Sequence, residues 1–302
     1  MLKEKKNAFL FLFSALILLF LFSKTDVHKI FLIFGSIDKN LLCLAIVISI
    51  SINIFGGSYK WKKILEAMNQ IAPFSVILQA KLISYPLKLL TPFKAGEIFK
   101  AGYLSWMRKF NFSKTLGSVI FDKFLNLLGT LSLLSGGVFF FEPKFYLKMV
   151  SLFGIALLLY LFLYIPYNLH TKMKFPSWIN NLFLGFKEIN PKRKAILLFY
   201  SIFYQLSELI NAYILGKAIN LDIPWGAIFL YVPLIVLIAN IPITVSGLGT
   251  REACIILFFF RYGTKEALFS LGLLLSLVEY VLPAFIGLVC FTMIKFHRNG
   301  EN

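Results

Sequence analysis

Acidic residues, cysteine and histidine are all scarce in this sequence. Charged residues fill only 15% of the 302 positions, against roughly a quarter in soluble globular chains, whereas 59% are hydrophobic and the mean hydropathy is +0.79. The three cysteines and three histidines lie far apart, so we expect neither a disulfide framework, nor a metal site, nor a bound cofactor. A soluble fold could not bury this much apolar surface. The composition predicts an all-α protein that crosses a membrane several times.

The charge balance is strongly basic. Lysine and arginine total 31 against 14 aspartates and glutamates, a formal net charge of +17. In a soluble protein this excess would indicate nucleic acid as a partner. Here the basic residues lie mostly in short loops between apolar runs, so the anionic face of a lipid bilayer is the expected partner, and no nucleic acid is expected. Self-association of the chain is compatible with these features.

Six apolar runs predict full membrane spans: residues 7–23, 41–55, 116–141, 150–169, 195–215 and 267–294. The first is interpreted as an uncleaved helix, because no small-residue cleavage site follows it. The second ends at Gly56 and Gly57, and the basic, amphipathic stretch 59–71 is then expected to lie in the membrane interface. Two further apolar stretches, 73–104 and 224–260, are interrupted by proline, glycine or lysine. Broken backbone at membrane depth is tolerated only against protein or a wet cavity, so both are predicted to be re-entrant hairpins.

The order span, span, hairpin, span occurs twice. Glu97 and Glu252 each follow a proline and a glycine in a broken stretch, and they lie 155 residues apart, about half the chain. Three spans per half would invert the second half, so residues 1–302 are predicted to form one transmembrane domain of two inverted repeats, 1–146 and 147–302. Chance recurrence of proline and glycine is the alternative. With the N-terminus inside, inner segments hold 21 lysines and arginines and outer segments 9, which predicts a cytoplasmic-membrane protein with both termini cytoplasmic.

The first candidate site is the fragment around Glu97. Lys94, Glu97 and Lys100 are spaced by three, which places them on one helix face, and Gly96 opens the backbone beside them. A positive surface at a helix N-terminus favours an anion such as phosphate. The alternative is an interfacial helix with snorkelling lysines, which is the favoured interpretation for three further basic residues: Lys88, Arg108 and Lys109.

The span after this fragment carries Asp122, Lys123 and Asn126. Buried charges in a span usually face a partner or a cavity, so Glu97 is expected to pair with Lys123, or Asp122 with Lys100. A purely structural ion pair is the alternative. The second candidate site is the loop before a new helix, where Arg251 offers a planar fork to phosphate and an external salt bridge with its neighbour is the alternative. Its residues are Gly247, Gly249, Arg251 and Glu252. Two intramembrane carboxylates, Glu208 and Glu279, could pair with these bases or carry protons.

Three segments, PFKAGEIFKAGYL, FDKFLNLLGTLSLL and IPITVSGLGTREACIILF, resemble the membrane domain of the lysylphosphatidylglycerol synthetase/flippase family. The resemblance implies translocation of a lipid or export of a lipid-linked intermediate. The family pattern has arginines where this chain has Lys94, Lys100 and Lys123; lysine keeps the charge but loses bidentate geometry. Bifunctional members carry a soluble aminoacyl-transferase domain after the membrane part. This chain ends at Asn302, so no synthetase activity is expected.

The favoured hypothesis is therefore a flippase-like transporter, not an enzyme, for a lipid with an anionic or zwitterionic head group. Six charged residues are expected to share one cavity between the hairpins near mid-membrane: Lys94, Lys100, Asp122, Lys123, Arg251 and Glu252. Counted together with Glu97 they carry four positive and three negative charges, and this small positive excess would suit one phosphate. The alternative is an intramembrane lipid phosphatase or transferase, although Ser246 and Thr250 have no histidine or paired acid nearby in the sequence. A non-transporting scaffold is a third possibility.

Overall fold

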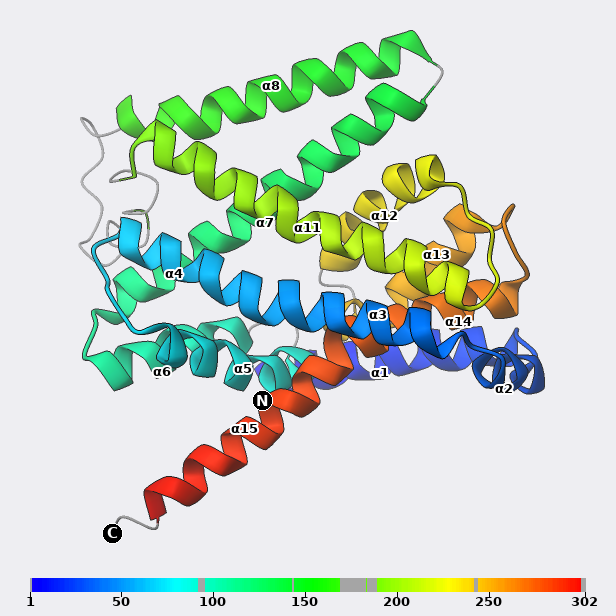
Figure 1. Ribbon diagram of the computed structural model, residues 1–302, viewed down its shortest axis with the longest axis horizontal. Helices are drawn as coiled ribbons and strands as arrows, with labels where there is room; N and C mark the ends of the chain where they lie inside the picture. The colour runs from blue at the N-terminus through cyan, green and yellow to red at the C-terminus, as the bar shows by residue number, and fades with distance from the viewer. Residues whose placement is uncertain are drawn as a thin grey trace.

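A computed structural model describes residues 2–91, 96–142, 144–168, 183, 189–241 and 244–299. Every regular element in these residues is a helix (Figure 1). The predicted site residue Lys94, and Pro242 of the second broken stretch, lie outside the described residues.

Five helices are long and apolar enough to cross a membrane, judged by length and composition: Lys39–Ala67, Phe112–Phe141, Phe145–Phe162, Pro191–Ala218 and Lys265–Thr292. They coincide with five of the six predicted spans. The remaining predicted span, 7–23, lies within helix α1 (Leu2–Ser23), of which the part Ser14–Ser23 is a shorter apolar helix. α2 (Val27–Gly35) follows, and Asp26 caps its N-terminus. The fold class is therefore confirmed as an all-helical protein with several helices of membrane-crossing length.

The prediction of a separate interfacial helix at 59–71 is wrong. α3 (Lys39–Ser49), the π-helical segment η1 (Ile50–Gly56) and α4 (Gly57–Ala67) run on as one rod. The two glycines do not end this helix. Gly57 instead lies against the Lys81 side chain, since a Cβ at this position would be 1.7 Å from the Nζ of Lys81. Trp61 and Lys60 are buried on the inner side of the rod. The amphipathic pattern thus marks a buried polar face rather than a membrane surface.

Each broken stretch forms two short helices that pack against one another. The first consists of α5 (Phe74–Leu90) and α6 (Gly96–Arg108). The second consists of α12 (Trp225–Asn240), the single turn η4 (Val245–Gly247) and α13 (Thr250–Phe259). At 1.5 Å per residue even α5, with 17 residues, spans only about 25 Å, less than the hydrocarbon core of a bilayer, about 30 Å. We call these the first and the second hairpin.

The two hairpins enter the bundle from opposite ends and meet in its middle. Figure 1 shows the first hairpin on the side where α4 ends and α11 (Pro191–Ala218) begins, and the second on the side where α11 ends. The hydroxyl of Ser246, in the second hairpin, donates a hydrogen bond of 2.6 Å to the backbone carbonyl of Lys88, at the end of α5. The broken ends of both hairpins therefore touch.

Long helices hold each hairpin in a reciprocal way. α5 packs on α15 (Leu282–Asn299), which continues α14 (Lys265–Ser276) through the π-helical segment η5 (Leu277–Val281); α12 packs on α7 (Phe112–Phe141). A Cβ on Gly287 of α15 would lie 2.1 Å from the Leu82 carbonyl oxygen, and one on Gly137 of α7 would lie 2.6 Å from that of Phe229. Only glycine permits such close backbone contact, which is typical of helix packing in membranes.

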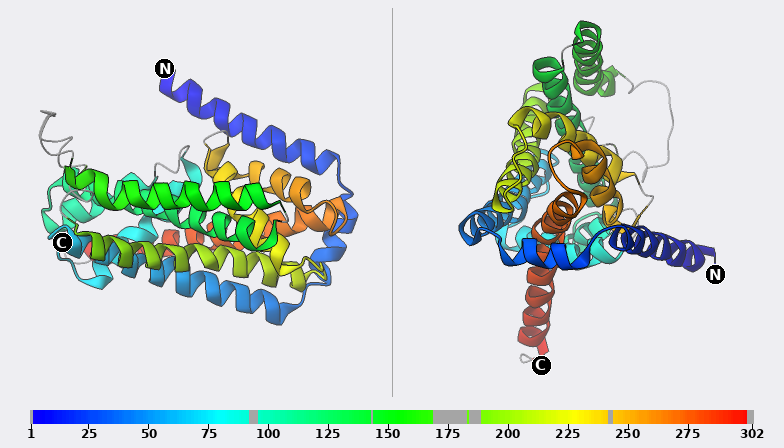
Figure 2. Two further views of the ribbon diagram at one scale, coloured as in Figure 1. Left: turned by 90° about the horizontal axis from the view of Figure 1, so that it is seen from above. Right: turned by 90° about the vertical axis from the view of Figure 1, so that its right-hand side faces the viewer.

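The outer surface of the bundle is apolar. Phe31, Phe153 and Phe199 are 72%, 73% and 67% exposed and are among many large hydrophobic side chains that point away from the core. α8 (Phe145–Asn168) packs on α7, and the end of α15 leaves the bundle (Figures 1 and 2). In water this surface would drive aggregation, whereas in a bilayer it faces lipid tails.

Candidate functional site

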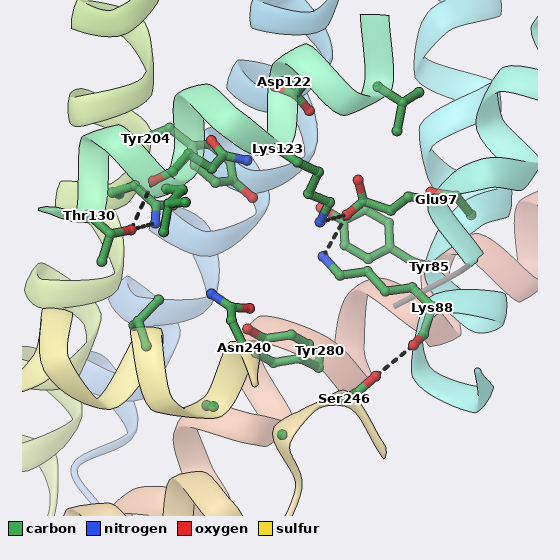
Figure 3. Close-up of a pocket in the computed structure, with 18 of the residues that line it drawn as sticks. Tyr85, Lys88, Glu97, Asp122, Lys123, Thr130, Tyr204, Asn240, Ser246 and Tyr280 are labelled. Atoms are coloured by element: carbon green, nitrogen blue, oxygen red, sulfur yellow. Dashed lines mark hydrogen bonds and ion pairs between the residues drawn. The ribbon is translucent and has the colours of Figure 1, made fainter. Parts of the chain in front are cut away.

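A cavity of about 790 Å³ lies where the two hairpins meet (Figure 3). Its walls come from α5 and α6 on one side, α7 and α11 along its length, and the end of α12 with the turn at Ser246 and Gly247 on the other. The polar lining includes five lysines, namely Lys60, Lys81, Lys88, Lys100 and Lys123. A lysine-rich cavity inside an otherwise apolar bundle is the main candidate site.

Three of these lysines converge on Glu97. The carboxylate lies 2.5 Å from Lys123 Nζ, 3.3 Å from Lys88 Nζ and 3.4 Å from Lys100 Nζ, and Figure 3 shows Lys88 and Lys123 reaching it from different helices. Gly96 makes this approach possible, because a Cβ there would lie 2.1 Å from the backbone nitrogen of Lys88. The hairpin turn thus brings the N-terminus of α6 against the end of α5, and one carboxylate against three ammonium groups.

Asp122 is the second anchor of the cluster. It lies 2.9 Å from Lys60 Nζ and 3.3 Å from Lys100 Nζ, and all three side chains are at most 8% exposed. The Lys60 ammonium also donates to the side-chain oxygen of Asn126, which in turn accepts a hydrogen bond of 2.8 Å from Ser201. Both pairings predicted from the sequence, Glu97 with Lys123 and Asp122 with Lys100, are therefore present.

Aromatic rings lie beside three of the ammonium groups. The ring centre of Tyr204 lies 4.8 Å from Lys60 Nζ and 5.3 Å from Lys81 Nζ, and that of Tyr280 lies 5.6 Å from Lys88 Nζ. Cation–π contacts of this length orient an ammonium without cancelling its charge. They fix the direction of the lysines toward the cavity.

Sequence reasoning missed part of this cluster. Lys88 was expected to snorkel at the interface, which is wrong: its ammonium pairs with Glu97 and its side chain is only 15% exposed. Lys60 and Lys81 were not singled out, although Lys60 follows the buried Asn53 by seven residues and so shares its helix face. Arg108 and Lys109 are exposed, as expected of interfacial residues.

The described residues that the second hairpin contributes to the cavity are uncharged. Gly247 and Ser246 line it, but Arg251 and Glu252 are absent from its described lining, so the expectation that these two charges share the cavity is wrong. The Glu252 carboxylate folds back on its own helix and accepts 2.6 Å hydrogen bonds from the Gly249 backbone N–H and the Ser276 hydroxyl. A glutamate three residues after the N-cap is pulled into this capping arrangement.

Arg251 is buried beside this cap. Its guanidinium donates to the Ser276 hydroxyl at 3.1 Å and stacks on Tyr280 at 4.2 Å from the ring centre. The external salt bridge considered for Arg251 and Glu252 does not occur among the described residues, where both side chains are at most 4% exposed. Gly249, with φ +86°, makes the turn that directs the chain into α13.

The two predicted relay carboxylates occupy different places. Glu208 lines the large cavity and also a small one of about 20 Å³ beside Arg251. Glu279 is only 7% exposed and accepts hydrogen bonds from the side-chain amides of Asn53 and Asn211. Asn53 and Glu279 both sit in π-helical segments, a feature often found at functional sites. That these carboxylates carry protons stays a prediction.

One edge of the cavity is apolar and reaches the outer surface. Ile98, Ile120, Leu127 and Ile241 line the cavity and are between 39% and 50% exposed. They belong to α6, α7 and the residue after α12. The lysine cluster is therefore bordered by apolar side chains that are partly exposed.

The lining combines ammonium groups, carboxylates and hydroxyls. Among the described residues no three histidine, cysteine or acidic side chains gather as a metal site. The Ser246 hydroxyl donates to a backbone carbonyl, and the Thr250 hydroxyl is hydrogen-bonded to that of Thr244 at 2.9 Å. Neither hydroxyl has a base positioned to activate it in these contacts. The cluster can bind an anion by charge.

Comparison with known proteins places the chain in a family of membrane proteins. The family model described as the lysylphosphatidylglycerol synthase TM region matches residues 7–287. The chain is also similar to the UPF0104 membrane protein MJ1595 of Methanocaldococcus jannaschii, with 22% identity over 325 residues that cover 97% of this chain and 96% of that protein. The match to the family model extends over nearly the whole chain and includes both hairpins. The chain therefore belongs to the lysylphosphatidylglycerol synthase transmembrane-region family.

Proposed function

We propose that this protein is a flippase-like transporter that moves a phosphate-bearing lipid head group across the cytoplasmic membrane. The observation that carries the proposal is the cavity, which combines a buried lysine cluster with an apolar edge open to the outer surface. A soluble anion would need only the first feature, and a hydrocarbon chain only the second. A lipid with an anionic group needs both.

In this mechanism Glu97 and Asp122 preorganise the lysines. Without these carboxylates, ammonium groups so close together would repel one another and turn away. An entering phosphate competes for the same ammonium groups, so that it exchanges its hydration for charge contacts while the tails remain in lipid. Preorganisation lowers the ordering cost of binding.

We further propose that both hairpins are re-entrant and that residues 1–146 and 147–302 are inverted repeats, with both termini cytoplasmic. Three observations support this proposal: the hairpin helices are too short to cross the hydrocarbon core, the hairpins enter from opposite ends, and α5 packs on α15 as α12 packs on α7. In such an architecture the two halves rock around a central site, which would expose it alternately to each side.

The test is a flipping assay in proteoliposomes that contain fluorescent phospholipids, read by accessibility of the label to an external quencher. We expect wild-type protein to accelerate head-group exchange over empty liposomes. Glu97→Gln should slow it at least about tenfold, since Lys88, Lys100 and Lys123 lose their shared partner. Glu66→Gln, which breaks a surface pair with Lys62 and Lys63, is the matched control and should leave the rate unchanged.

Two outcomes would contradict the proposal. No acceleration by wild-type protein for any phosphate-bearing lipid tried would remove the transport function. Full flipping activity of Glu97→Gln would remove the assigned site and leave the transport function standing. The alternative of an intramembrane lipid phosphatase would regain support only from phosphate release by purified protein, because the hydroxyls of Ser246 and Thr250 are engaged in other hydrogen bonds.

A further inference from the structure

The charges that line the cavity do not cancel. Among the described residues that line it, five lysines face three carboxylates, those of Glu97, Asp122 and Glu208, a formal excess of two positive charges. Four of the lysines already share Glu97 and Asp122 between them. Uncompensated charge at membrane depth is unfavourable unless a counter-ion or water accompanies it.

The least compensated of these charges is Lys81. Among the described residues no carboxylate lies within 4.0 Å of its ammonium group. That group lies 5.3 Å from the ring centre of Tyr204. Lys60 approaches the same ring, but it also has Asp122 as an ion-pair partner. Lys81 thus lies at the cavity wall beside an aromatic face, with its amino group available to a ligand.

From this imbalance we infer the charge of the substrate: a lipid whose head group carries two negative charges, that is, a phosphate monoester or a diphosphate. The inference rests on the proposed function and deepens it. A phosphate monoester carries about −1.5 to −2 at pH 7 and matches the excess of two. A phosphodiester neutralises half of it, a zwitterionic head group none, and an aminoacylated head group adds positive charge to a positive site.

The apolar edge of the cavity favours a lipid phosphate over free inorganic phosphate. Ile98, Ile120 and Leu127 line the cavity and are also partly exposed, so a hydrocarbon chain can contact them, whereas inorganic phosphate would gain nothing from them. Burial of each methylene contributes to binding. The ligand is therefore a lipid and not free phosphate.

Competition binding tests the inference. Purified protein in detergent is mixed at pH 8 with equal amounts of dioleoyl phosphatidic acid and dioleoyl phosphatidylglycerol, and the bound lipids are counted by native mass spectrometry. The acyl chains are identical, so the ratio reports head-group charge alone. We expect phosphatidic acid to be preferred about tenfold, an excess of inorganic phosphate to displace neither lipid, and lysyl-phosphatidylglycerol to compete least.

Lys81→Gln should reduce this preference about fivefold, because among the described residues that line the cavity it removes the lysine that has no carboxylate within 4.0 Å, and so breaks no ion pair there. Lys192→Gln changes the same net charge at an exposed position and should leave the ratio as in wild type. Size-exclusion profiles check that both variants fold. Equal binding of the two lipids, displacement by inorganic phosphate, or an unchanged ratio in Lys81→Gln would overturn the inference.

The flipping assay separates this result from the proposed function. Equal acceleration of monoester, diester and zwitterionic lipids would leave the transporter standing and refute the charge selectivity. Selective binding of phosphatidic acid without any flipping would refute transport and retain the selectivity.

Discussion

The two hairpins use buried charge in opposite ways. In the first, Glu97 faces the cavity and shares three lysines that come from α5, α6 and α7. In the second, Glu252 is fully buried and turned toward the start of its own helix and Ser276. The same local pattern of proline, glycine and glutamate thus yields a cavity-facing group in one place and a structural cap in the other. Position relative to the helix start decides which, because Glu252 lies three residues after the N-cap Gly249.

The largest difference should appear when the cap is removed. Glu252→Gln weakens two charge-assisted hydrogen bonds and leaves the buried Arg251 with less negative charge around it. We expect a loss of about 2–3 kcal/mol of unfolding free energy, measured by denaturation in mixed detergent micelles. Glu66→Gln on the surface should cost at most about 1 kcal/mol. If Glu252→Gln were as stable as wild type but inactive in flipping, the second hairpin would be a binding element after all.

Glycine substitutions sharpen the comparison at the first hairpin. A Cβ on Gly96 would collide with the backbone of Lys88, so Gly96→Ala must shift the start of α6 and pull Glu97 away from Lys88. We expect the rate of flipping to fall about tenfold, as for loss of a buried ion-pair partner. The loss of unfolding free energy should be smaller than in Glu252→Gln. Gly102→Ala on the same helix meets its nearest neighbour at 4.0 Å and should stay active. A fully active Gly96→Ala protein would separate the hairpin turn from function.

The smallest structural effect is expected at Glu279. Glu279→Gln keeps the shape of the side chain but turns one hydrogen-bond acceptor toward Asn53 or Asn211 into a donor, at a cost of about 1 kcal/mol. If Glu279 carries protons, this variant should still flip lipid but lose any acceleration by a pH gradient, measured in liposomes with buffered interiors. Retention of that acceleration would restrict Glu279 to a structural role.

The sequence allowed the helical class, five of the spans and the two central ion pairs to be predicted. Charged residues inside apolar runs are costly enough that Glu97, Asp122 and Lys123 had to find partners. Lys60 and Lys81 were missed, because their contacts with Tyr204 depend on which helices pack together. The spacing of Lys60 from Asn53 indicates a shared helix face but does not indicate which helix that face contacts. The cap at Glu252 had a visible signature in its spacing from Gly249, but the symmetry between the two glutamates suggested a shared role instead.

The contact between Ser246 and the end of α5 has a consequence for electrical tightness. If neither hairpin crosses the bilayer, as proposed, the described residues that separate the two aqueous sides at this point include the ends of two hairpin helices joined by a 2.6 Å hydrogen bond. Moving one elementary charge across a membrane potential of 100 mV changes its energy by about 2.3 kcal/mol, so even a brief separation of the ends would let small ions pass. Ion leak through the protein would then depend on how often the contact between Ser246 and Lys88 opens.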